Sequence, residues 1–305
     1  GSWSTNSKTK TKIIPDKTNI HNAYLKRYNS ALQRFATFKH NAVKFGAIEQ
    51  RVFEVFSKSH SDLNRLYSGK VTLRLQTGLS DTFSTAVRAA QYYIHDMRKI
   101  FDSENVPREL IYIAFVESMF NPKAISKVGA SGMWQFMPST AKQYMVLNSF
   151  IDERNSPLKA ARAAARLLRD NYNILGTWPL AVTAYNHGAE GMIKARTALK
   201  TNDLSEIIKS YDSNTFGFAS KNFYAEYVAA RSSYHHLKNI RMFLEKDTSK
   251  PLASLTTTKS ISLSQLIKST RLSQATIVKY NPCLAKNAFK NYAHRKLPLD
   301  YKLYI

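Results

Sequence analysis

Apolar residues recur every three or four positions along most of the chain, which is the spacing that places them on one face of an α-helix. Residues 22–67 follow this pattern with a break near Gly46, and they predict two helices. Residues 70–79 alternate apolar and polar positions between glycines, which fits both a short strand and an irregular connector. Further helices are expected over residues 80–101, 107–120, 158–173, 180–185 and parts of 191–245. The pattern therefore predicts a mainly α fold.

Interruptions of the helical pattern divide the chain into four parts. A polar, lysine-rich stretch predicts a flexible basic arm over residues 1–20, and a helical extension that wraps the core is expected over residues 21–95. Residues 96–246 predict the main helical domain. A stretch rich in Ser, Thr and Lys from Asp247 to Thr258 predicts a linker. Residues 255–305 then predict a small C-terminal module.

One acidic residue, Glu117, lies inside a strongly apolar predicted helix. Leu110, Ile113 and Ala114 precede it by seven, four and three positions, so its side chain shares their helical face. An isolated glutamate near a helix end is often structural and turns to solvent or pairs with an arginine. Here the apolar neighbours and the negative end of the helix dipole both disfavour a carboxylate. Glu117 is therefore expected to keep its proton toward neutral pH, as a general acid requires.

Two further stretches place polar side chains among apolar ones. Gln135 is an amide between large apolar residues, in a loop over residues 126–139 that is too apolar to be fully exposed. The loop is therefore expected to fold back over a cleft, although Trp134 and Met137 also fit simple packing positions. Tyr185-Asn186 closes an apolar helix, where an asparagine by itself fits a structural helix end.

The spacing of these residues resembles the signature of lytic transglycosylases of the goose-type lysozyme superfamily, which carry an SLT domain. The shared positions run through Glu117-Ser118, Gly132-Met133-Trp134-Gln135-Phe136-Met137-Pro138, Asp152-Glu153-Arg154 and Ala184-Tyr185-Asn186-His187-Gly188, and the resemblance covers about half the chain. It implies a lysozyme-like helical catalytic domain with Glu117 as the catalytic residue. The substrate-binding residues that it implies are Ser118, Met133, Gln135, Met137, Tyr185 and Asn186.

Three positions carry more particular implications of this resemblance. The Tyr185 hydroxyl would hydrogen-bond and orient the Glu117 carboxyl. Ser156 stands where the family usually has an acid, and His187 stands where it usually has a small residue. Neither Ser156 nor His187 is assigned a role.

The resemblance also implies the reaction, in which one glutamate serves as acid and then as base. It protonates the leaving oxygen, the N-acetyl group of the muramic sugar attacks the anomeric carbon, and the glutamate then deprotonates the C6 hydroxyl. The chain is thus expected to cut the β-1,4 bond between N-acetylmuramic acid and N-acetylglucosamine in peptidoglycan. It would release 1,6-anhydro products without a cofactor or a metal.

Two alternatives to this reaction stay open. A lysozyme on the same scaffold would complete the reaction with water, activated by Asp152, Glu153 or Glu190. Arg154 and Lys159 nearby favour ordinary ion pairing for these acids. An inactive wall-binding protein is the second alternative, and the complete set of motif residues disfavours it.

The charge distribution indicates an anionic partner. The net charge is +24, and the flanks are its main source, with 14 Lys/Arg against 4 Asp/Glu in residues 1–80 and 9 against 1 in residues 251–305. Such flanks suit a cell wall that bears peptide carboxylates, an anionic lipid surface or a nucleic acid. A dedicated nucleic-acid function is disfavoured, because the sequence contains no zinc-finger, RRM or KH motif and its basic residues are spread along the chain.

The last part of the chain and its cysteine content complete the prediction. The stretch from Ile261 to Tyr304 resembles a small LysM-like glycan-binding unit, and a basic module that caps the catalytic core would explain the same residues. The single cysteine, Cys283, excludes an internal disulfide. No apolar run reaches the roughly 18 residues that span a bilayer, and a signal peptide or lipid anchor is expected to have been removed. These features predict a monomeric enzyme that is periplasmic, outer-membrane-associated or secreted.

Overall fold

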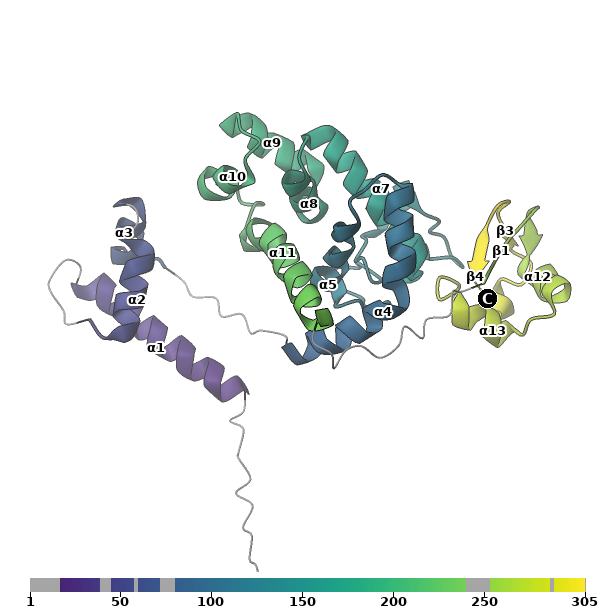
Figure 1. The fold of residues 1–305 in the computed structure, drawn as a ribbon, viewed down its shortest axis with the longest axis horizontal. Helices are drawn as coiled ribbons and strands as arrows, with labels where there is room; N and C mark the ends of the chain where they lie inside the picture. Colours follow the sequence, from purple (N-terminus) through teal and green to yellow (C-terminus); the bar gives the residue numbers. More distant parts are fainter. Residues whose placement is uncertain are drawn as a thin grey trace, which may run out of the picture. The chain divides into compact units, whose positions relative to one another are not determined.

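The computed structural model describes residues 17–38, 45–57, 60–71, 80–239, 253–285 and 288–304, and the chain divides into two compact units, 1–78 and 79–305 (Figure 1). Helices dominate both units, which confirms the mainly α fold. The boundary falls at residue 78 and not near residue 95 as predicted, because the helix that starts at Ser80 packs into the core of the second unit. Residues 1–16 and 72–79 lie outside the described residues, and so do most of the predicted arm and the predicted strand or connector.

The described part of the first unit contains three helices where the pattern predicted two. They are α1 (Lys17–Phe38), α2 (Ala47–Phe56) and α3 (His60–Tyr67), and α1 begins inside the stretch predicted as an arm. Gly46 is the N-cap of α2, as the predicted break required. Leu32 and Phe35 of α1 are buried against Val52 of α2 and Leu66 of α3. This unit therefore has an apolar core of its own.

The second unit begins with α4 (Ser80–Ser103), which matches the predicted helix closely. Proline and glycine residues set several of the boundaries that follow, since Pro138 and Pro157 start helices and Gly176 ends one. The remaining helices of residues 80–239, referred to below as the helical region, are η1 (Arg108–Tyr112), α5 (Ile113–Ser118), α6 (Pro138–Tyr144), η2 (Glu153–Asn155), α7 (Pro157–Leu175), α8 (Trp178–His187), α9 (Ala189–Leu199), α10 (Leu204–Ser210) and α11 (Phe218–Asn239).

Helix α7 packs against both α4 and α8, and its alanines explain how it can (Figure 1). Ala160, Ala161 and Ala164 have no exposed surface, and such small side chains let neighbouring helices approach closely. The largest apolar cluster of the chain surrounds α7 and includes Phe115 of α5 and Trp134 of the loop after α5. The end of α5 therefore lies at the edge of a rigid core.

The C-terminal module contains two short antiparallel sheets and three short helices. Strand β1 pairs with β4, with Leu255 opposite Leu303, and β2 pairs with β3. Strand β1 falls within the stretch predicted as a linker, because Leu255 packs onto the core of the module. The elements are β1 (Ser254–Thr256), β2 (Ile261–Ser262), α12 (Leu263–Thr270), α13 (Gln274–Tyr280), α14 (Ala288–Asn291), β3 (Lys296–Leu297) and β4 (Lys302–Tyr304).

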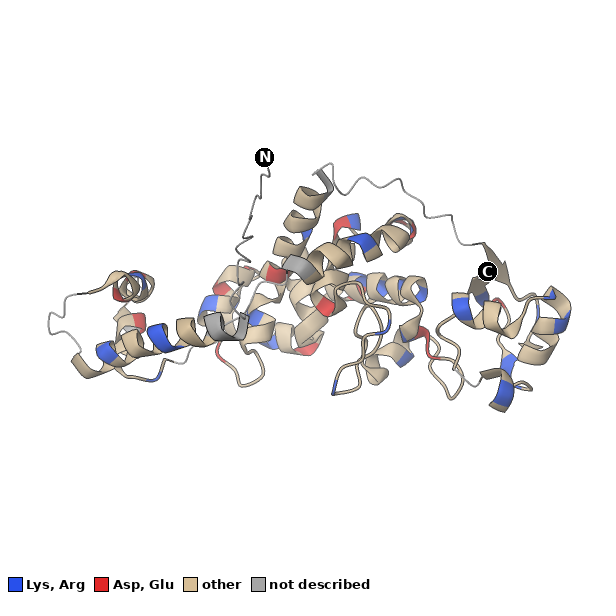
Figure 2. Ribbon diagram, turned by 90° about the horizontal axis from the view of Figure 1, so that it is seen from below, with Lys and Arg blue, Asp and Glu red and all other residues tan. Residues whose placement is uncertain are grey.

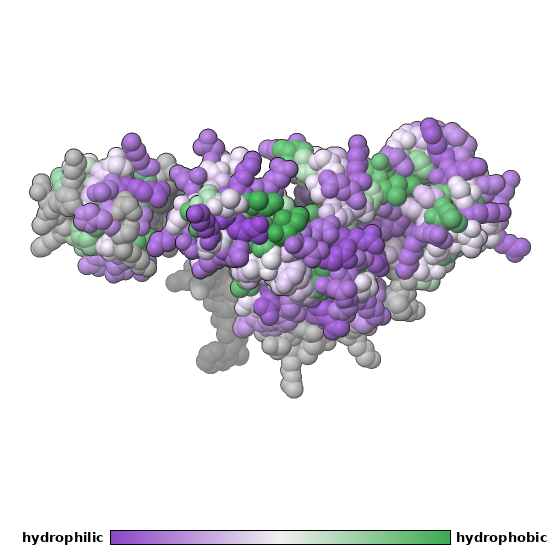
Figure 3. Space-filling model, turned by 90° about the horizontal axis from the view of Figure 1, so that it is seen from above, coloured by the Kyte–Doolittle hydropathy of each residue, from purple (hydrophilic) through white to green (hydrophobic). Residues whose placement is uncertain are grey.

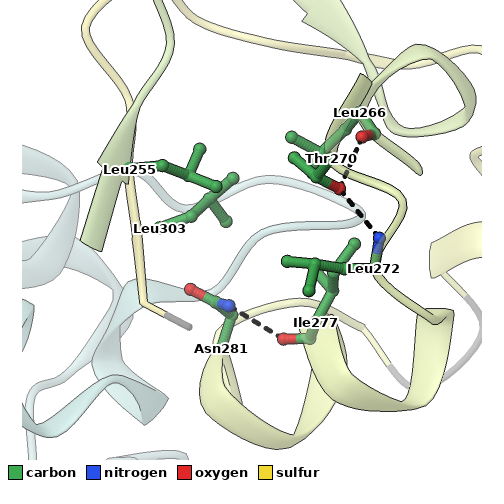
Figure 4. Close-up of a pocket in the computed structure, with 7 residues that line it drawn as sticks. All are labelled: Leu255, Leu266, Thr270, Leu272, Ile277, Asn281 and Leu303. Carbon is green, nitrogen blue, oxygen red and sulfur yellow. Dashed lines mark hydrogen bonds between the residues drawn. The ribbon is translucent and has the colours of Figure 1, made fainter. Parts of the chain in front are cut away.

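A small apolar pocket in this module is too narrow to hold a water molecule (Figure 4). Its polar side chains already have partners inside the protein. The Asn281 amide donates to the carbonyl oxygens of Ile277 and Tyr304 at 2.8 Å and accepts from the Tyr304 amide at 2.9 Å, and the Thr270 hydroxyl donates to Leu266 O. These bonds make the pocket a packing feature of the module. Whether the module is a LysM-like unit or a cap stays a prediction.

The module contacts the helical region through the segment before α7. The Asp152 amide donates to the Cys283 carbonyl oxygen at 2.7 Å, and Phe150 and Ile151 are buried in the apolar cluster of the module. None of the helices that the structure describes is long and apolar enough to cross a membrane. The segment before α7 thus belongs to the apolar cluster of the module.

Candidate functional site

Glu117 lies in the last turn of α5, which is shorter than the predicted helix. The chain enters through the 3-10 helix η1, with Pro107 as its N-cap, and α5 ends at Met119 and Phe120, whose φ angles are +53° and +55°. These left-handed residues end the helix before Asn121-Pro122, where the sequence predicted its end. Ile113 is fully buried on the same helix, so the Glu117 backbone is anchored to the core while its side chain keeps part of its surface exposed.

The environment of the Glu117 carboxyl strongly favours its neutral form. Burial among apolar groups and, to a smaller extent, the negative charge of Glu226 on α11 together raise its pKa from the ordinary 4.5 to about 8. At pH 7 a group with such a pKa is protonated in about ten molecules for each one that is ionised. Within the part of the chain that the structure describes, no hydrogen bond holds this proton. Glu117 therefore holds a proton that none of the described groups accepts.

Ser118 joins the end of α5 to the loop that follows. Its hydroxyl donates to the Met133 carbonyl oxygen at 2.7 Å and accepts from the Asn121 amide at 3.1 Å. The Met133 side chain has no exposed surface, which argues against a direct contact with a substrate. Met137 is 40% exposed and can make such a contact.

The loop between α5 and α6 has an unusual backbone at Gln135, where φ is +48°. The side-chain nitrogen of Gln135, Nε2, donates to the backbone carbonyl oxygens of Gly132 at 2.8 Å and Ala124 at 3.2 Å. The side-chain oxygen of Gln135 therefore remains for other groups. Gly132 has a φ of +81°, and a side chain there would collide with the Arg154 carbonyl oxygen. The loop does fold back, since Trp134 is fully buried and stacks on Phe101.

Exposed apolar residues also occur in this loop. Ile125 and Val128 are 77% and 76% exposed. Figure 3 shows one face of the molecule, on which apolar patches are interrupted by hydrophilic residues. The apolar side chains of the loop thus divide between the core and the surface.

Tyr185 of α8 lies close to Glu117, but its hydrogen bond differs from the expected one. Its hydroxyl donates to the Trp134 carbonyl oxygen at 2.9 Å and not to the Glu117 carboxyl. Burial raises the pKa of Tyr185 well above its ordinary value, and the charge that Glu117 carries when ionised raises it further. The ring also stacks on Phe223 of α11 at 6.4 Å between centroids. Tyr185 therefore fixes the loop behind Glu117.

Asn186 is exposed at the end of α8 and is held by a residue of α11. Its side-chain oxygen accepts from the Ser220 hydroxyl at 3.0 Å, and the same hydroxyl oxygen lies 3.4 Å from Nδ1 of His187. Hydrogen bonds thus join Ser118 of α5 and Tyr185 of α8 to the loop between α5 and α6, and Tyr185 lies close to Glu117. Ser220 and Glu226 of α11 complete the group.

Sequence reasoning did not single out Ser220 or Glu226. The contacts of α11 with α5 and α8 bring these two polar residues into the site. The available signal in the sequence was the spacing of Ser220, Phe223 and Glu226, because residues three or four apart share a helical face. Phe223 stacks on Tyr185, so this face is the one that meets the site.

Two of the three acids proposed to activate water are engaged in ion pairs. Asp152 pairs with Arg154 at 2.8 Å, and Glu153 pairs with Lys159 at 2.6 Å, which confirms the predicted ion pairing. Glu190 is exposed in the first turn of α9. Glu226 is therefore the acid that acts on Glu117.

The chain is similar to known lytic transglycosylases over part of its length. Membrane-bound lytic murein transglycosylase D of Escherichia coli K12 is 35% identical over 115 residues, which cover 37% of this chain and 25% of that protein. The transglycosylase of Enterobacteria phage PRD1 is 37% identical over 82 residues, or 27% of this chain and 29% of that protein. Among solved structures, the 70 kDa soluble lytic transglycosylase SLT70 of Escherichia coli covers 77% of this chain and 46% of its own, at 15% identity and a TM-score of 0.42.

The chain spans about a quarter of the length of the first of these relatives. Its match to a family model lies where the motif residues are. Residues 97–208 match the model described as the Transglycosylase SLT domain, and this range contains Glu117, the loop with Gln135, and Tyr185-Asn186. The family resemblance of the motif residues is thereby confirmed, and this chain carries a Transglycosylase SLT domain over residues 97–208.

Proposed function

We propose that this chain cleaves the β-1,4 bond between N-acetylmuramic acid and N-acetylglucosamine in peptidoglycan as a lytic transglycosylase. The observation that carries the proposal is the Glu117 carboxyl, which is held neutral at the exposed end of a buried helix inside an SLT domain. The lytic murein transglycosylases to which the chain is similar support the choice of substrate.

Glu117 supplies both proton transfers of the proposed reaction. As an acid it gives its proton to the leaving glycosidic oxygen while the N-acetyl carbonyl oxygen attacks the anomeric carbon. The resulting carboxylate then takes the proton of the C6 hydroxyl, and the C6 oxygen attacks the anomeric carbon. The bond between that carbon and the N-acetyl carbonyl oxygen breaks, and the N-acetyl group stays on the sugar. The acid is regenerated and a 1,6-anhydro sugar forms without water. A pKa of about 8 suits a group that must give and then regain a proton near neutral pH.

The other site residues bind and orient the sugar in this proposal. The Gln135 carbonyl oxygen and the Asn186 amide nitrogen face no partner among the described residues and can bond to sugar hydroxyl or acetamido groups. Ser118 and Tyr185 act through the loop that they fix, since their hydroxyl protons go to the carbonyl oxygens of Met133 and Trp134.

The basic flanks would hold the anionic polymer. Lys and Arg residues are spread over the C-terminal module (Figure 2), and residues 251–305 carry nine of them against one acid. A cell wall that bears peptide carboxylates is the partner that such a surface and an SLT domain share. The proposal therefore places the protein in a bacterial envelope.

Hydrolysis is the alternative that one observation favours. Glu226 brings a second carboxylate to the acid, and a lysozyme needs such a group to activate water. The test is a complete digest of purified peptidoglycan followed by mass spectrometry of the fragments, with the Glu117→Gln variant as the control. Products one water lighter than their hydrolytic counterparts support the lytic reaction. Fragments with reducing ends would establish the lysozyme instead.

A further inference from the structure

His187 has no role in the proposed reaction, yet it lies in a cluster of polar side chains with Ser220 and Asn186. Its ring packs edge-on against Phe216 at 5.0 Å between centroids, and its Nδ1 lies 3.4 Å from the Ser220 hydroxyl oxygen. On the other side of the ring, Nε2 is buried and has no hydrogen-bond partner among the described residues. The ring occupies the space over Gly191, where any side chain would collide with it.

Two arrangements of protons fit these distances. In the first, His187 Nδ1–H donates to Ser220, and the Ser220 hydroxyl donates to the Asn186 side-chain oxygen. In the second, the Asn186 amide is turned over and donates to Ser220, whose hydroxyl donates to an unprotonated Nδ1. The two differ in which group of Asn186 faces the solvent, because a hydroxyl has one proton to give.

Nε2 of His187 decides between the two arrangements. In the second, the neutral ring must carry its proton on Nε2, where a buried N–H would have no acceptor among the described groups. An unsatisfied buried donor destabilises a protein, and orphaned N–H groups are rarer than unused acceptors. In the first arrangement Nε2 holds only a lone pair above the glycine. Burial also lowers the pKa of His187, so the ring stays neutral at neutral pH.

We propose that His187, acting through Ser220, is a positioning residue that holds the Asn186 amide with its NH2 group toward the sugar. The proposal rests on the proposed function and adds to it the polarity of this contact. Asn186 then donates two protons and binds a hydrogen-bond acceptor of the glycan, such as an acetamido carbonyl or a hydroxyl oxygen. A group that can only donate, such as the ammonium of a de-N-acetylated sugar, does not fit there.

Binding measurements in an inactive background test this role without a need for turnover. Glycan binding is measured by calorimetry for Glu117→Gln and for double variants that add Ser220→Ala, His187→Phe or His187→Asn, with an N-acetylated peptidoglycan oligosaccharide as the probe. His187→Phe keeps the ring shape and removes the donor, whereas the amide nitrogen of His187→Asn reproduces the donor at Nδ1. Ser220→Ala and His187→Phe are expected to raise the Kd about tenfold, which is the effect of one lost hydrogen bond of ordinary strength.

The conservative variant separates positioning from simple packing. His187→Asn is expected to bind within about threefold of the Glu117→Gln parent, even though it packs less well than His187→Phe. Equal weakening by both, or no weakening by His187→Phe, would overturn the proposal. The melting temperature of each variant shows whether it is folded.

A spectroscopic measurement tests the proton arrangement directly. In the 15N-histidine-labelled full chain, long-range proton–nitrogen correlation spectra show which ring nitrogen of His187 carries the proton. The proposal requires Nδ1–H, and a proton on Nε2 would overturn it. This result does not depend on any activity, so a chain that binds no glycan would refute the proposed function and leave the tautomer intact.

Discussion

Replacing Glu117 with glutamine should make the protein more stable while it abolishes cleavage. The folded protein holds this carboxyl neutral up to a pKa of about 8, whereas the unfolded chain ionises it near the ordinary value of 4.5. Between these two pH values the folded state binds more protons than the unfolded state, so the stability of the parent falls as the pH rises. Glutamine has nearly the same shape and never ionises, so it removes this penalty.

The size of the gain follows from the distance between the pKa and the working pH. A pH of 7 lies about 2.5 units above 4.5, the pKa of the carboxyl in the unfolded chain. Over this range each pH unit lowers the free energy of unfolding of the parent by about 1.4 kcal/mol. The glutamine variant should therefore be more stable than the parent by about 3 kcal/mol at pH 7. The difference should be close to zero at pH 4.5 and constant above pH 8.

The assay is urea unfolding of both proteins between pH 4.5 and 8.5. Two of the three tryptophans, Trp134 and Trp178, lie in the second unit, so tryptophan fluorescence reports mainly on the unit that contains Glu117. Glu190→Gln is the matched control, since it makes the same change on an exposed side chain and should show no comparable rise with pH. A difference between Glu117→Gln and the parent that is independent of pH would refute the argument that Glu117 is held neutral by its surroundings.

Three further predictions concern Glu226, two loop glycines and the lysines of the C-terminal module. Glu226→Gln removes a negative charge that raises the pKa of Glu117, so the alkaline limb of the pH–activity profile should move to lower pH, and an unmoved limb would show that Glu226 does not act on the acid. Gly132→Ala should lower the free energy of unfolding by more than about 2 kcal/mol, because the added methyl group would collide with the Arg154 carbonyl oxygen. Gly129→Ala, at a φ of +91° with open space around it, should lower it by about 1 kcal/mol. Equal losses for the two variants in chemical denaturation would contradict this. Neutralising the exposed Lys259, Lys268 and Lys279 together should weaken binding to peptidoglycan sacculi at low salt and leave the melting temperature unchanged, and binding that ignores both the substitutions and the salt would count against an electrostatic role.

Truncation is a poor way to test the C-terminal module, for a reason that the sequence did not reveal. Phe150 and Ile151 are buried in the cluster of the module, and Lys159 lies 3.3 Å from the centre of the Tyr301 ring while it pairs with the nearly buried Glu153. Removing the module would expose the apolar side chains of Phe150 and Ile151 to water. It would also take the Tyr301 ring away from the Lys159–Glu153 ion pair. Substituting surface lysines separates charge from folding.

Local pattern predicted the helices well because apolar periodicity and proline or glycine punctuation act within a few residues. The core around Ala160 and the ends of α6, α7 and α8 follow from such signals. The extent of unit 1 did not, because α4 has the periodicity of a surface helix, and only packing shows which core it joins. In the same way, β1 was hidden in a polar stretch, since its partner β4 lies 48 residues further along the chain.

Within the site, the sequence identified Glu117 because a carboxyl on an apolar helical face is anomalous in any fold. It did not predict the partner of Tyr185. The hydroxyl donates to the Trp134 carbonyl oxygen and not to the Glu117 carboxyl, and this depends on atomic positions that a sequence pattern does not give. Nor did it separate Met133 from Met137, which lie on opposite sides of a loop without periodicity. Glu226 was missed because its proximity to Glu117 arises from the packing of α11 against α5.

The second carboxylate bears on the reaction class as well as on the pKa. In the lytic reaction Glu226 acts only through its charge, so Glu226→Gln should keep its turnover at a pH low enough to hold Glu117 protonated, and its products should still be 1,6-anhydro sugars. In a hydrolytic reaction Glu226 would take a proton from water, so the glutamine variant would lose turnover at every pH. Measuring both rate and product mass for this variant across pH therefore separates the two uses of the same residue. Lost turnover at low pH, together with reducing ends in the parent digest, would replace the lytic reaction with hydrolysis.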